Sequence, residues 1–329
     1  MSWMTSAPLV KRVFRSGRKP ERGRINLPAS WIGTKIVVAP ERDYVVVPKA
    51  EYERLKRRLR SLTFVKEMFE SVLNAHDGRK MFSVVSKTWN PVTGCLHMCS
   101  YCWARRLAET KLRNSERYRE GFVPRLNERE LRVKFGPGDV VFVSDMGDLF
   151  GDFVPGEWIS RVLAHTRRFP ETYFLFLTKN PARYKEFLDE MPERAILGAT
   201  IETDRDDLYV REAVSGAPLP SRRYEAMRDL EWDAKFVSIE PILDFDPERF
   251  PGWIEEIGPV MVYVGYDNYS NRLPEPPLRK TLELVERLSE ITLVVRKTMR
   301  RAWNEGIEAY AQGGGGERAL GRRGRLAQE

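Results

Sequence analysis

The sequence predicts an α/β protein with an open, partial (β/α)6 barrel and a small β-rich module in front of it. Three observations predict this fold. From residue 82 onward, short and nearly continuous apolar runs alternate with helical patterns, which is typical of a parallel sheet covered by helices. The alternation repeats about six times, which favours an open partial barrel over a closed eight-unit barrel. Before it, residues 8–48 contain three short strand-like runs that each end in proline.

The length and composition indicate one large domain, or one large and one small domain. The chain has 329 residues and is 42% apolar, which is enough for a substantial core. It contains no apolar run of about 18 residues, the length that would cross a bilayer, and no N-terminal signal-like segment. All three cysteines fall within 95–102, so they cannot form a disulfide framework. We therefore expect a cytoplasmic protein without a membrane partner.

Residues 8–48 are predicted to form the β module. Its strand-like runs are "GRINLP" (23–28), "KIVVAP" (35–40) and "DYVVVP" (43–48). The module resembles the AbrB-like swapped-hairpin DNA-binding domains at Gly23, Arg24, Ile25, Leu27, Pro28, Trp31, Ile32 and Gly33. The resemblance implies binding to DNA and a homodimer formed by two such modules. Pairing with a second copy also suits a module too short to bury a good core alone.

The positive charge of the chain is concentrated at its ends. Residues 1–60 hold 15 Lys and Arg against 5 Asp and Glu, and residues 312–329 hold 4 against 2. The whole chain carries +8, so the region between them is mildly acidic. A basic module beside a neutral body is the electrostatic pattern of a nucleic-acid contact, and a solvated basic arm is the alternative. The predicted nucleic-acid-binding residues are Arg15, Arg18, Lys19, Arg22 and Arg24.

Three further segments follow the β module. Residues 49–80 are predicted to be a linker helix, because leucines and other apolar residues recur there at steps of three and four. Residues 81–300 form the predicted barrel. Residues 301–329 form a basic tail, most of which has no hydrophobic pattern, and we expect it to be disordered.

The elements of the barrel follow from the apolar pattern. The expected strands are 82–86, 139–143, 173–177, 195–201, 235–239 and 260–264, with a final run at 291–296. The expected helices lie near 101–113, 156–168, 181–190, 219–230 and 277–290.

The cysteines Cys95, Cys99 and Cys102 have the spacing C-x3-C-x2-C and lie in a loop after the first expected strand. Three thiolates leave one iron of a [4Fe–4S] cluster open for a small molecule. A Cys3His zinc site that includes His97 is an alternative, although this histidine lies between two of the cysteines. Buried structural cysteines are a further alternative, but three within eight mostly polar residues are not core patterning.

This spacing, with Tyr101 before the last cysteine, is the signature of radical S-adenosylmethionine (SAM) enzymes. The chain also resembles one radical SAM family of phages and archaea, without an assigned reaction, that is distantly similar to spore photoproduct lyase. The resemblance spans about 82–297. It rests on "TWNPVTGC" (88–95), "DLF" (148–150), "LTKNP" (177–181), "LGATIE" (197–202) and "SIEPIL" (238–243). Where the family has "GGES", this chain has "VGYDN" (264–268).

The resemblance implies a radical SAM partial barrel with two cofactors, a [4Fe–4S] cluster on the three cysteines and SAM on its open iron. An external one-electron donor would reduce the cluster, and the reduced cluster would cleave SAM to a 5′-deoxyadenosyl radical. Catalytic chemistry gathers at the carboxyl ends of strands in such folds, so the SAM-binding candidates lie there. They are Ser144, Asp145 and Asp148 for the ammonium, Glu202 for the ribose, Arg222, Arg223 or Lys179 for the carboxylate, and Glu240 for adenine or substrate.

Three functions remain open at this point. The first is a radical SAM enzyme that modifies or repairs nucleic acid, directed there by the basic module. The second is a radical SAM enzyme that acts on a protein or metabolite. The third is an AbrB-type DNA-binding regulator whose Fe–S barrel senses redox state or SAM without turnover.

Overall fold

The structure, a computed structural model, describes residues 36–37, 47–48, 63 and 84–305. The chain divides into two compact units, residues 1–67 and 68–329. In the first unit, β1 (Ile36–Val37) pairs antiparallel with β2 (Val47–Pro48). These strands fall inside the second and third strand-like runs of the predicted β module.

Most predictions for the two ends of the chain lie outside the described residues. These predictions are the remainder of the β module at 8–48 with its AbrB-like core, the linker helix at 49–80 apart from Thr63, and the tail from residue 306. The five basic residues proposed to bind nucleic acid lie outside as well: Arg15, Arg18, Lys19, Arg22 and Arg24.

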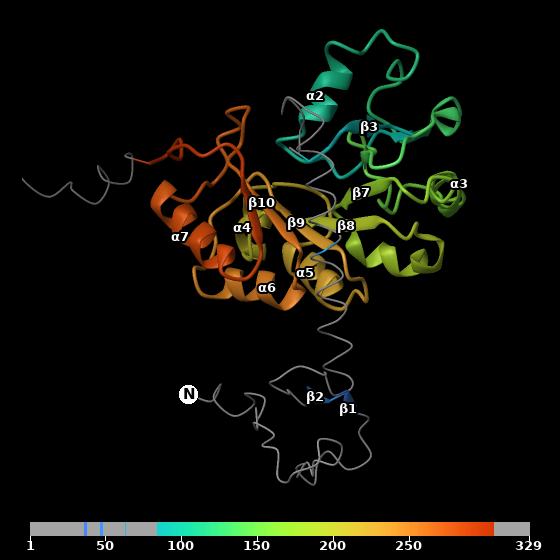
Figure 1. The fold of residues 1–329 in the computed structure, drawn as a ribbon. Helices are drawn as coiled ribbons and strands as arrows, with labels where there is room; N and C mark the ends of the chain where they lie inside the picture. Colours follow the sequence, from blue (N-terminus) through green and yellow to red (C-terminus); the bar gives the residue numbers. More distant parts are fainter. Residues whose placement is uncertain (1–35, 38–46, 49–62, 64–83, 306–329) are drawn as a thin grey trace, which may run out of the picture. The chain divides into compact units, whose positions relative to one another are not determined.

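Within the described residues, a sheet of seven parallel strands forms the centre of the second unit (Figure 1). Its strands are β3 (Lys87–Trp89), β6 (Val140–Val143), β7 (Tyr173–Thr178), β8 (Ala195–Thr200), β9 (Lys235–Ile239), β10 (Met261–Val264) and β11 (Leu293–Arg296). They lie in the order β11-β10-β9-β8-β7-β6-β3, so each unit adds one neighbour to the sheet. The edge strands β3 and β11 do not pair with each other in this part of the chain, so the sheet is open, as predicted.

The first strand of this sheet lies a few residues later than predicted. The apolar run at 82–86 predicted a strand, but β3 begins at Lys87 and pairs with β6. Val84 and Val85 are buried immediately before it. Their apolar character therefore reflects packing in the core, which hydrophobic patterning alone does not distinguish from strand pairing.

The helices agree with the sequence pattern in part. The predicted positions are occupied by α2 (Trp103–Glu109), α3 (Gly156–Thr166), α5 (Pro220–Arg228) and α7 (Leu278–Ser289). Two further helices were not predicted, α4 (Asp206–Arg211) and α6 (Arg249–Ile257). A small antiparallel pair, β4 (Val92–Thr93) and β5 (Arg125–Leu126), and the 3-10 turn η2 (Glu130–Arg132) lie between β3 and β6 in the sequence.

The predicted helix at 181–190 is instead two 3-10 turns, η3 (Pro181–Glu186) and η4 (Leu188–Glu190). Tyr184 and Phe187 are both buried in this segment. Phe187 lies between the two turns with a φ of −127°, which is outside the helical range. One continuous helix is therefore interrupted at this residue.

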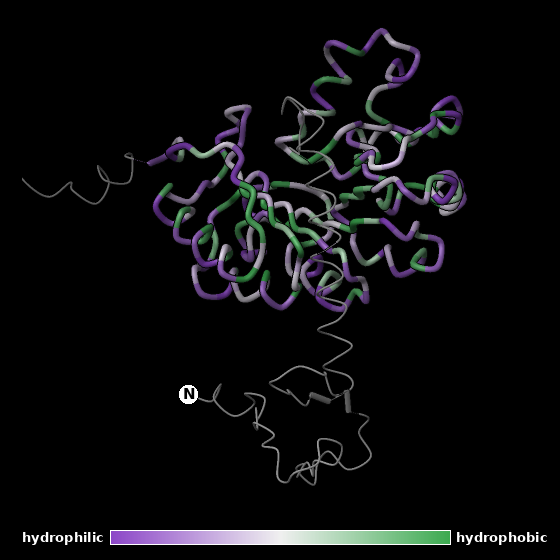
Figure 2. The backbone as a smooth tube through the Cα atoms, viewed as in Figure 1, coloured by the Kyte–Doolittle hydropathy of each residue, from purple (hydrophilic) through white to green (hydrophobic). Residues whose placement is uncertain are grey.

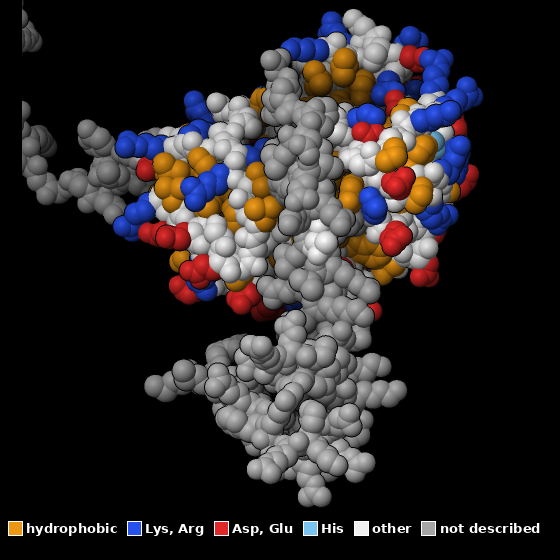
Figure 3. Space-filling view, viewed as in Figure 1, with side chains coloured by type: hydrophobic (Ala, Val, Ile, Leu, Met, Phe, Trp, Pro, Cys, Tyr) orange, Lys and Arg blue, Asp and Glu red, His pale blue; other side chains and the backbone are white. Residues whose placement is uncertain are grey.

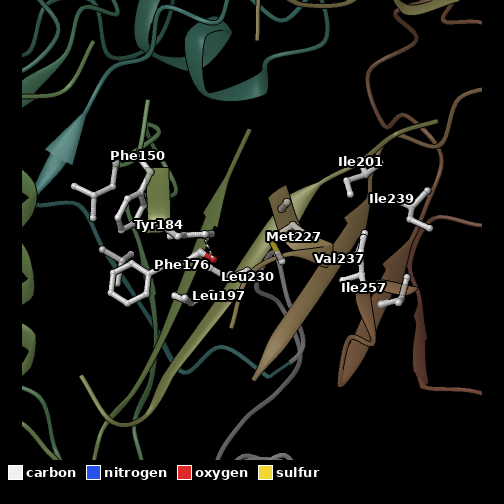
Figure 4. Packing of buried hydrophobic residues seen from close by; sticks show 14 of the residues in the cluster. Phe150, Phe176, Tyr184, Leu197, Ile201, Met227, Leu230, Val237, Ile239 and Ile257 are labelled. Atoms are coloured by element: carbon white, nitrogen blue, oxygen red, sulfur yellow. Dashed lines mark hydrogen bonds between the residues drawn. The ribbon is translucent and has the colours of Figure 1, made fainter. Parts of the chain in front are cut away.

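The core lies between the sheet and the helices on its outer face. Helix α5 contacts η3 and α6, and α6 contacts α7, so these elements follow one another along one face of the sheet. Figure 2 shows that the strands are the most hydrophobic part of the backbone. In Figure 4, Phe176, Leu197 and Val237 of the strands pack with Met227 of α5 and Ile257 of α6. None of the helices in the described residues is long and apolar enough to span a membrane.

Candidate active site

The carboxyl ends of the strands surround a cavity of about 420 Å³. All three cysteines line it. Six strands contribute polar side chains at or just after their carboxyl ends: Ser144, Lys179, Thr200, Glu240, Asp267 and Lys297. The polar groups that the sequence places after separate strands therefore meet around one space, as expected for a parallel sheet.

The cysteine loop depends on a glycine at its start. Gly94 has a φ of +86°, in the left-handed region that favours glycine. A Cβ atom built on Gly94 would lie 2.0 Å from the carbonyl oxygen of Val123. The close approach is part of the loop's attachment, because the amide of Cys95 donates to the Phe122 carbonyl at 3.1 Å. A side chain at position 94 is therefore incompatible with this geometry.

A second loop, residues 213–217, holds the other end of the cysteine loop. The Gly216 amide donates to the His97 carbonyl at 2.7 Å. The Ser100 amide donates to the Val214 carbonyl at 2.9 Å. The two bonds attach the cysteine loop to the segment that follows α4, on the opposite side from Gly94.

Asp148, in the segment that follows β6, anchors the cysteine loop through His97. Its Oδ2 lies 3.0 Å from His97 Nε2 and accepts the Lys179 amide at 2.9 Å. Its Oδ1 accepts the Thr178 hydroxyl at 2.6 Å and the Phe150 amide at 3.1 Å. Burial by itself raises the pKa of Asp148, but the hydrogen bond and charge of His97 and the other donors hold the pKa below its ordinary value. Because both oxygens are occupied, this carboxylate suits an anchor better than the predicted ligand of an ammonium.

The donor set fits a cluster better than a single metal ion. Among the described residues, no three His, Cys, Asp or Glu side chains are grouped to hold one ion. The His97 imidazole is paired with Asp148, which disfavours the Cys3His zinc alternative. A [4Fe–4S] cluster takes each thiolate on a different iron, so its ligands surround a space rather than a point. Three cysteines lining one cavity match that requirement.

The thiols of Cys95 and Cys99 are held in an environment that favours their protonated form. Burial, and next the charge of Asp148, raise the pKa of Cys95 above its ordinary value. Burial also raises the pKa of Cys99. A bound metal centre must therefore displace protons from these sulfurs, which makes its binding dependent on pH.

Ser144 and Asp145 follow β6 directly and both line the cavity. Ser144 has a φ of 59°, is almost fully buried, and its hydroxyl has no partner within the described part of the chain. A strained residue with an unsatisfied buried hydroxyl is typical of a binding site. Asp145 accepts a hydrogen bond from the Asn90 amide group at 2.5 Å, and burial raises its pKa.

Glu202 lies beneath the cavity rather than in its wall. One carboxylate oxygen binds Arg223 Nη1 at 2.7 Å, and the other contacts the Lys179 ammonium and the Tyr101 hydroxyl. Burial raises the pKa of Glu202, but the charges of Arg223 and Lys179 outweigh burial and lower it to about 2. This buried network supports the cavity from below. The geometry does not favour the predicted ribose contact of Glu202.

Neither of the two arginine candidates lines the cavity. Arg222 is exposed and pairs with Glu225 at 2.9 Å. Arg223 is fully buried and bound to Glu202. Neither of them lines the cavity, so the structure does not favour the predicted contact of either arginine with a carboxylate there. Lys179 is the candidate cation that remains in the wall.

Glu240 lies on the wall formed by the ends of β9 to β11. It accepts the Ser238 hydroxyl at 3.1 Å and pairs with Lys297 Nζ at 2.9 Å. Burial raises the pKa of Glu240 above its ordinary value. Lys297 was not among the predicted residues, although it directly follows the run at 291–296. The strand-end rule, applied to that last run, would have found it.

The protein is therefore an α/β protein with an open parallel sheet, and its three cysteines line a cavity at the carboxyl ends of the strands. The chain matches the family described as "Protein of unknown function (DUF5131)" over residues 80–248, just over half of its length. It belongs to this family.

Three solved structures are similar to this chain at low identity. One is a spore photoproduct lyase mutant with dinucleoside spore photoproduct, at 12% identity and a TM-score of 0.40, covering 61% of this chain and 60% of that one. Streptococcus suis SuiB bound to precursor peptide SuiA has 12% identity and a TM-score of 0.41, covering 65% and 49%. The same protein bound to S-adenosylmethionine has 12% identity and a TM-score of 0.40, covering 67% and 49%. The chain thus spans less than two thirds of these proteins. No curated protein matches it.

Proposed function

We propose that this protein is a radical SAM enzyme that binds a [4Fe–4S] cluster through Cys95, Cys99 and Cys102 and binds SAM in the same cavity. The observation that carries the proposal is that three cysteines line one cavity together with the buried hydroxyl of Ser144, which has no hydrogen-bond partner among the described residues. The thiols supply the ligands, and a polar wall opposite them supplies contacts for a zwitterionic cofactor. When bound, the cluster would supply one electron for the cleavage of SAM to a 5′-deoxyadenosyl radical.

The residues in the wall divide into two groups with separate tasks. Ser144 and Asp145 are suited to the SAM ammonium, because one offers a free hydroxyl and the other a carboxylate. Lys179 is suited to the SAM carboxylate, since its ammonium lines the cavity on top of the Glu202 network. Glu240 forms an ion pair with Lys297 in the wall of the same cavity and is suited to adenine or substrate.

We assign nucleic acid as the substrate class on the distribution of charge. Residues 105–134, which follow the cysteines, hold 10 Lys and Arg against 5 Glu. Figure 3 shows Lys and Arg side chains gathered on this part of the surface. Together with the basic residues 1–60, this segment offers two positive regions to a polyanion. A basic segment beside the cavity supports a phosphate-bearing substrate more than a neutral metabolite.

Anaerobic reconstitution tests the proposed function. The purified protein is loaded with iron and sulfide and given SAM and dithionite. We expect about four irons per chain, the broad absorbance of a [4Fe–4S] cluster and release of 5′-deoxyadenosine. Cys99→Ala removes one of only three thiols, so it should lose the cluster, whereas Ser160→Ala on α3 should keep it. An intact cluster that never yields 5′-deoxyadenosine would reject the enzyme and favour the sensing regulator.

A further inference from the structure

The cysteine sulfurs differ in the kind of hydrogen-bond donor that they meet. The Sγ atom of Cys102 accepts from a backbone amide, that of Arg105, at 3.3 Å. The Sγ atom of Cys99 instead lies 3.1 Å from the hydroxyl of Ser215. Among the described residues, this is the one hydrogen bond in which a side chain contacts a cysteine sulfur. It is therefore the one that a single substitution can remove.

The Ser215 hydroxyl has a second partner, and this allows it to change direction. Its oxygen lies 3.0 Å from the His97 carbonyl and accepts the amide of Ala217 at 3.1 Å. With Cys99 as a thiol, the S–H donates to the serine oxygen and the serine O–H donates to the carbonyl. A thiolate has no proton and can only accept. The serine O–H must then turn from the carbonyl to the sulfur.

This rotation of the Ser215 hydroxyl leaves none of the groups involved without a hydrogen-bond partner. The His97 carbonyl keeps the Gly216 amide as its donor at 2.7 Å. Ser215 keeps the amide of Ala217. The loop at 213–217 therefore supplies one fixed donor to the carbonyl and one movable donor to the sulfur. Position 216 also has little room, because a Cβ there would lie 3.3 Å from the same carbonyl oxygen.

We propose that Ser215 is a positioning residue for the cluster ligand Cys99 and that its hydroxyl raises the reduction potential of the cluster. The inference rests on the proposed function. An external carrier adds one electron to the cluster, and no bond is made or broken in this step. The added charge spreads onto the sulfurs, so a donated hydrogen bond stabilises the reduced state more than the oxidised state. Removal of the donor therefore makes reduction harder.

The test is a potentiometric titration of the reconstituted full-length protein, followed by the electron paramagnetic resonance signal of the reduced cluster. Ser215→Ala removes the donor, and Ser215→Thr keeps a hydroxyl. Ser100→Ala is the matched control, because its hydroxyl lies next to Cys99 in the cysteine loop but donates to the Val214 carbonyl. At a fixed potential we expect the ratio of reduced to oxidised cluster to fall about tenfold in Ser215→Ala, or about 59 mV for one electron. The other two variants should match the wild type.

Each other outcome also decides the question. Equal potentials in Ser215→Ala and the wild type overturn the inference and leave the proposed function standing. Loss of the cluster from Ser215→Ala with its retention in Ser215→Thr supports the hydroxyl as the requirement. Its loss from both Ser215 variants overturns the inference, because the loop and not the hydroxyl is then responsible. Failure of the wild type to take up a cluster rejects the proposed function itself.

Discussion

The imidazole of His97 lies 3.0 Å from the carboxylate of Asp148, and this contact joins the middle of the cysteine loop to the segment that follows β6. Both side chains are buried. The pair sets the position of the two cysteines that flank His97 relative to the sheet. It accounts for a histidine inside a cysteine motif without making that histidine a metal ligand.

Asp148→Asn is expected to loosen the cysteine loop. The substitution removes a charged acceptor that serves four donors, and hydrogen bonds to charged groups contribute about 1.5–3 kcal/mol. We expect a lower melting temperature and less iron bound after reconstitution. Asp152→Asn is the control, since Asp152 accepts a hydrogen bond from Asn180 nearby and does not contact the loop. Equal iron content in both variants would contradict the anchoring role.

Gly94→Ala should prevent the cysteine loop from forming. The new Cβ would meet the Val123 carbonyl, and the left-handed backbone at Gly94 adds strain. We expect a soluble protein that melts earlier and binds little iron. Gly252→Ala is the matched control, because Gly252 lies in helix α6 with nothing within 4 Å of its added Cβ. Alanine favours a helix over glycine by about 1 kcal/mol, so that variant should be at least as stable as the wild type.

Ionisation of Glu202 should make the stability of the folded chain fall as pH drops below about 4.5. Its pKa is about 2 in the folded chain and 4.5 ordinarily, so the unfolded chain binds the proton first as pH falls. Its contribution is complete above about pH 4.5 and is lost as pH drops toward 2. Glu202→Gln should lower the melting temperature at pH 7 and flatten this decline between pH 4.5 and 2. Glu225→Gln, which changes a half-buried carboxylate paired with Arg222, should keep the wild-type decline.

Lys235 should produce a second rise of stability with pH, in the alkaline range. Its ammonium donates to the Met227 carbonyl at 2.9 Å, and burial lowers its pKa from 10.5 to about 8. Between these values the unfolded chain holds more protons, so stability rises with pH from 8 to 10.5. Thermal melts of Lys235→Met should lack this rise, whereas exposed Lys185→Met should retain it. A parallel pH profile for Lys235→Met and the wild type would refute the prediction.

The basic N-terminal residues should control the salt dependence of nucleic-acid binding. Each neutralised phosphate contact contributes about 0.9 to the slope of log affinity against log salt for duplex DNA. The variant replaces five residues by glutamine: Arg15, Arg18, Lys19, Arg22 and Arg24. The slope should become shallower by about 4.5. Fluorescence anisotropy across a salt series measures it. The control replaces five exposed arginines in or next to helices: Arg168, Arg211, Arg228, Arg279 and Arg287. An unchanged slope in the first variant would remove the N-terminal module from the interface.

Local patterns in the sequence determined much of this protein. The spacing of the cysteines and the apolar runs predicted a parallel, open sheet with a cysteine loop after its first strand, and the structure has this arrangement. The position of the first strand was wrong, because Val84 and Val85 are apolar through burial and not through pairing. The family matched over residues 80–248 is one of unknown function, so the proposed reaction is argued from the residues of the site and not from the family's description.

Which of the candidate residues line the cavity depends on contacts between elements that are far apart in the sequence. Arg222 and Arg223 are neighbours in the sequence, but successive residues of a helix point in different directions, so one is exposed and the other buried on Glu202. Ser215 lies 116 residues from Cys99 and meets it only through the packing of two loops. Sequence periodicity reports which residues share one face of one element. The contacts between elements that give the cavity its charge and its hydrogen bonds exist only once the sheet is assembled.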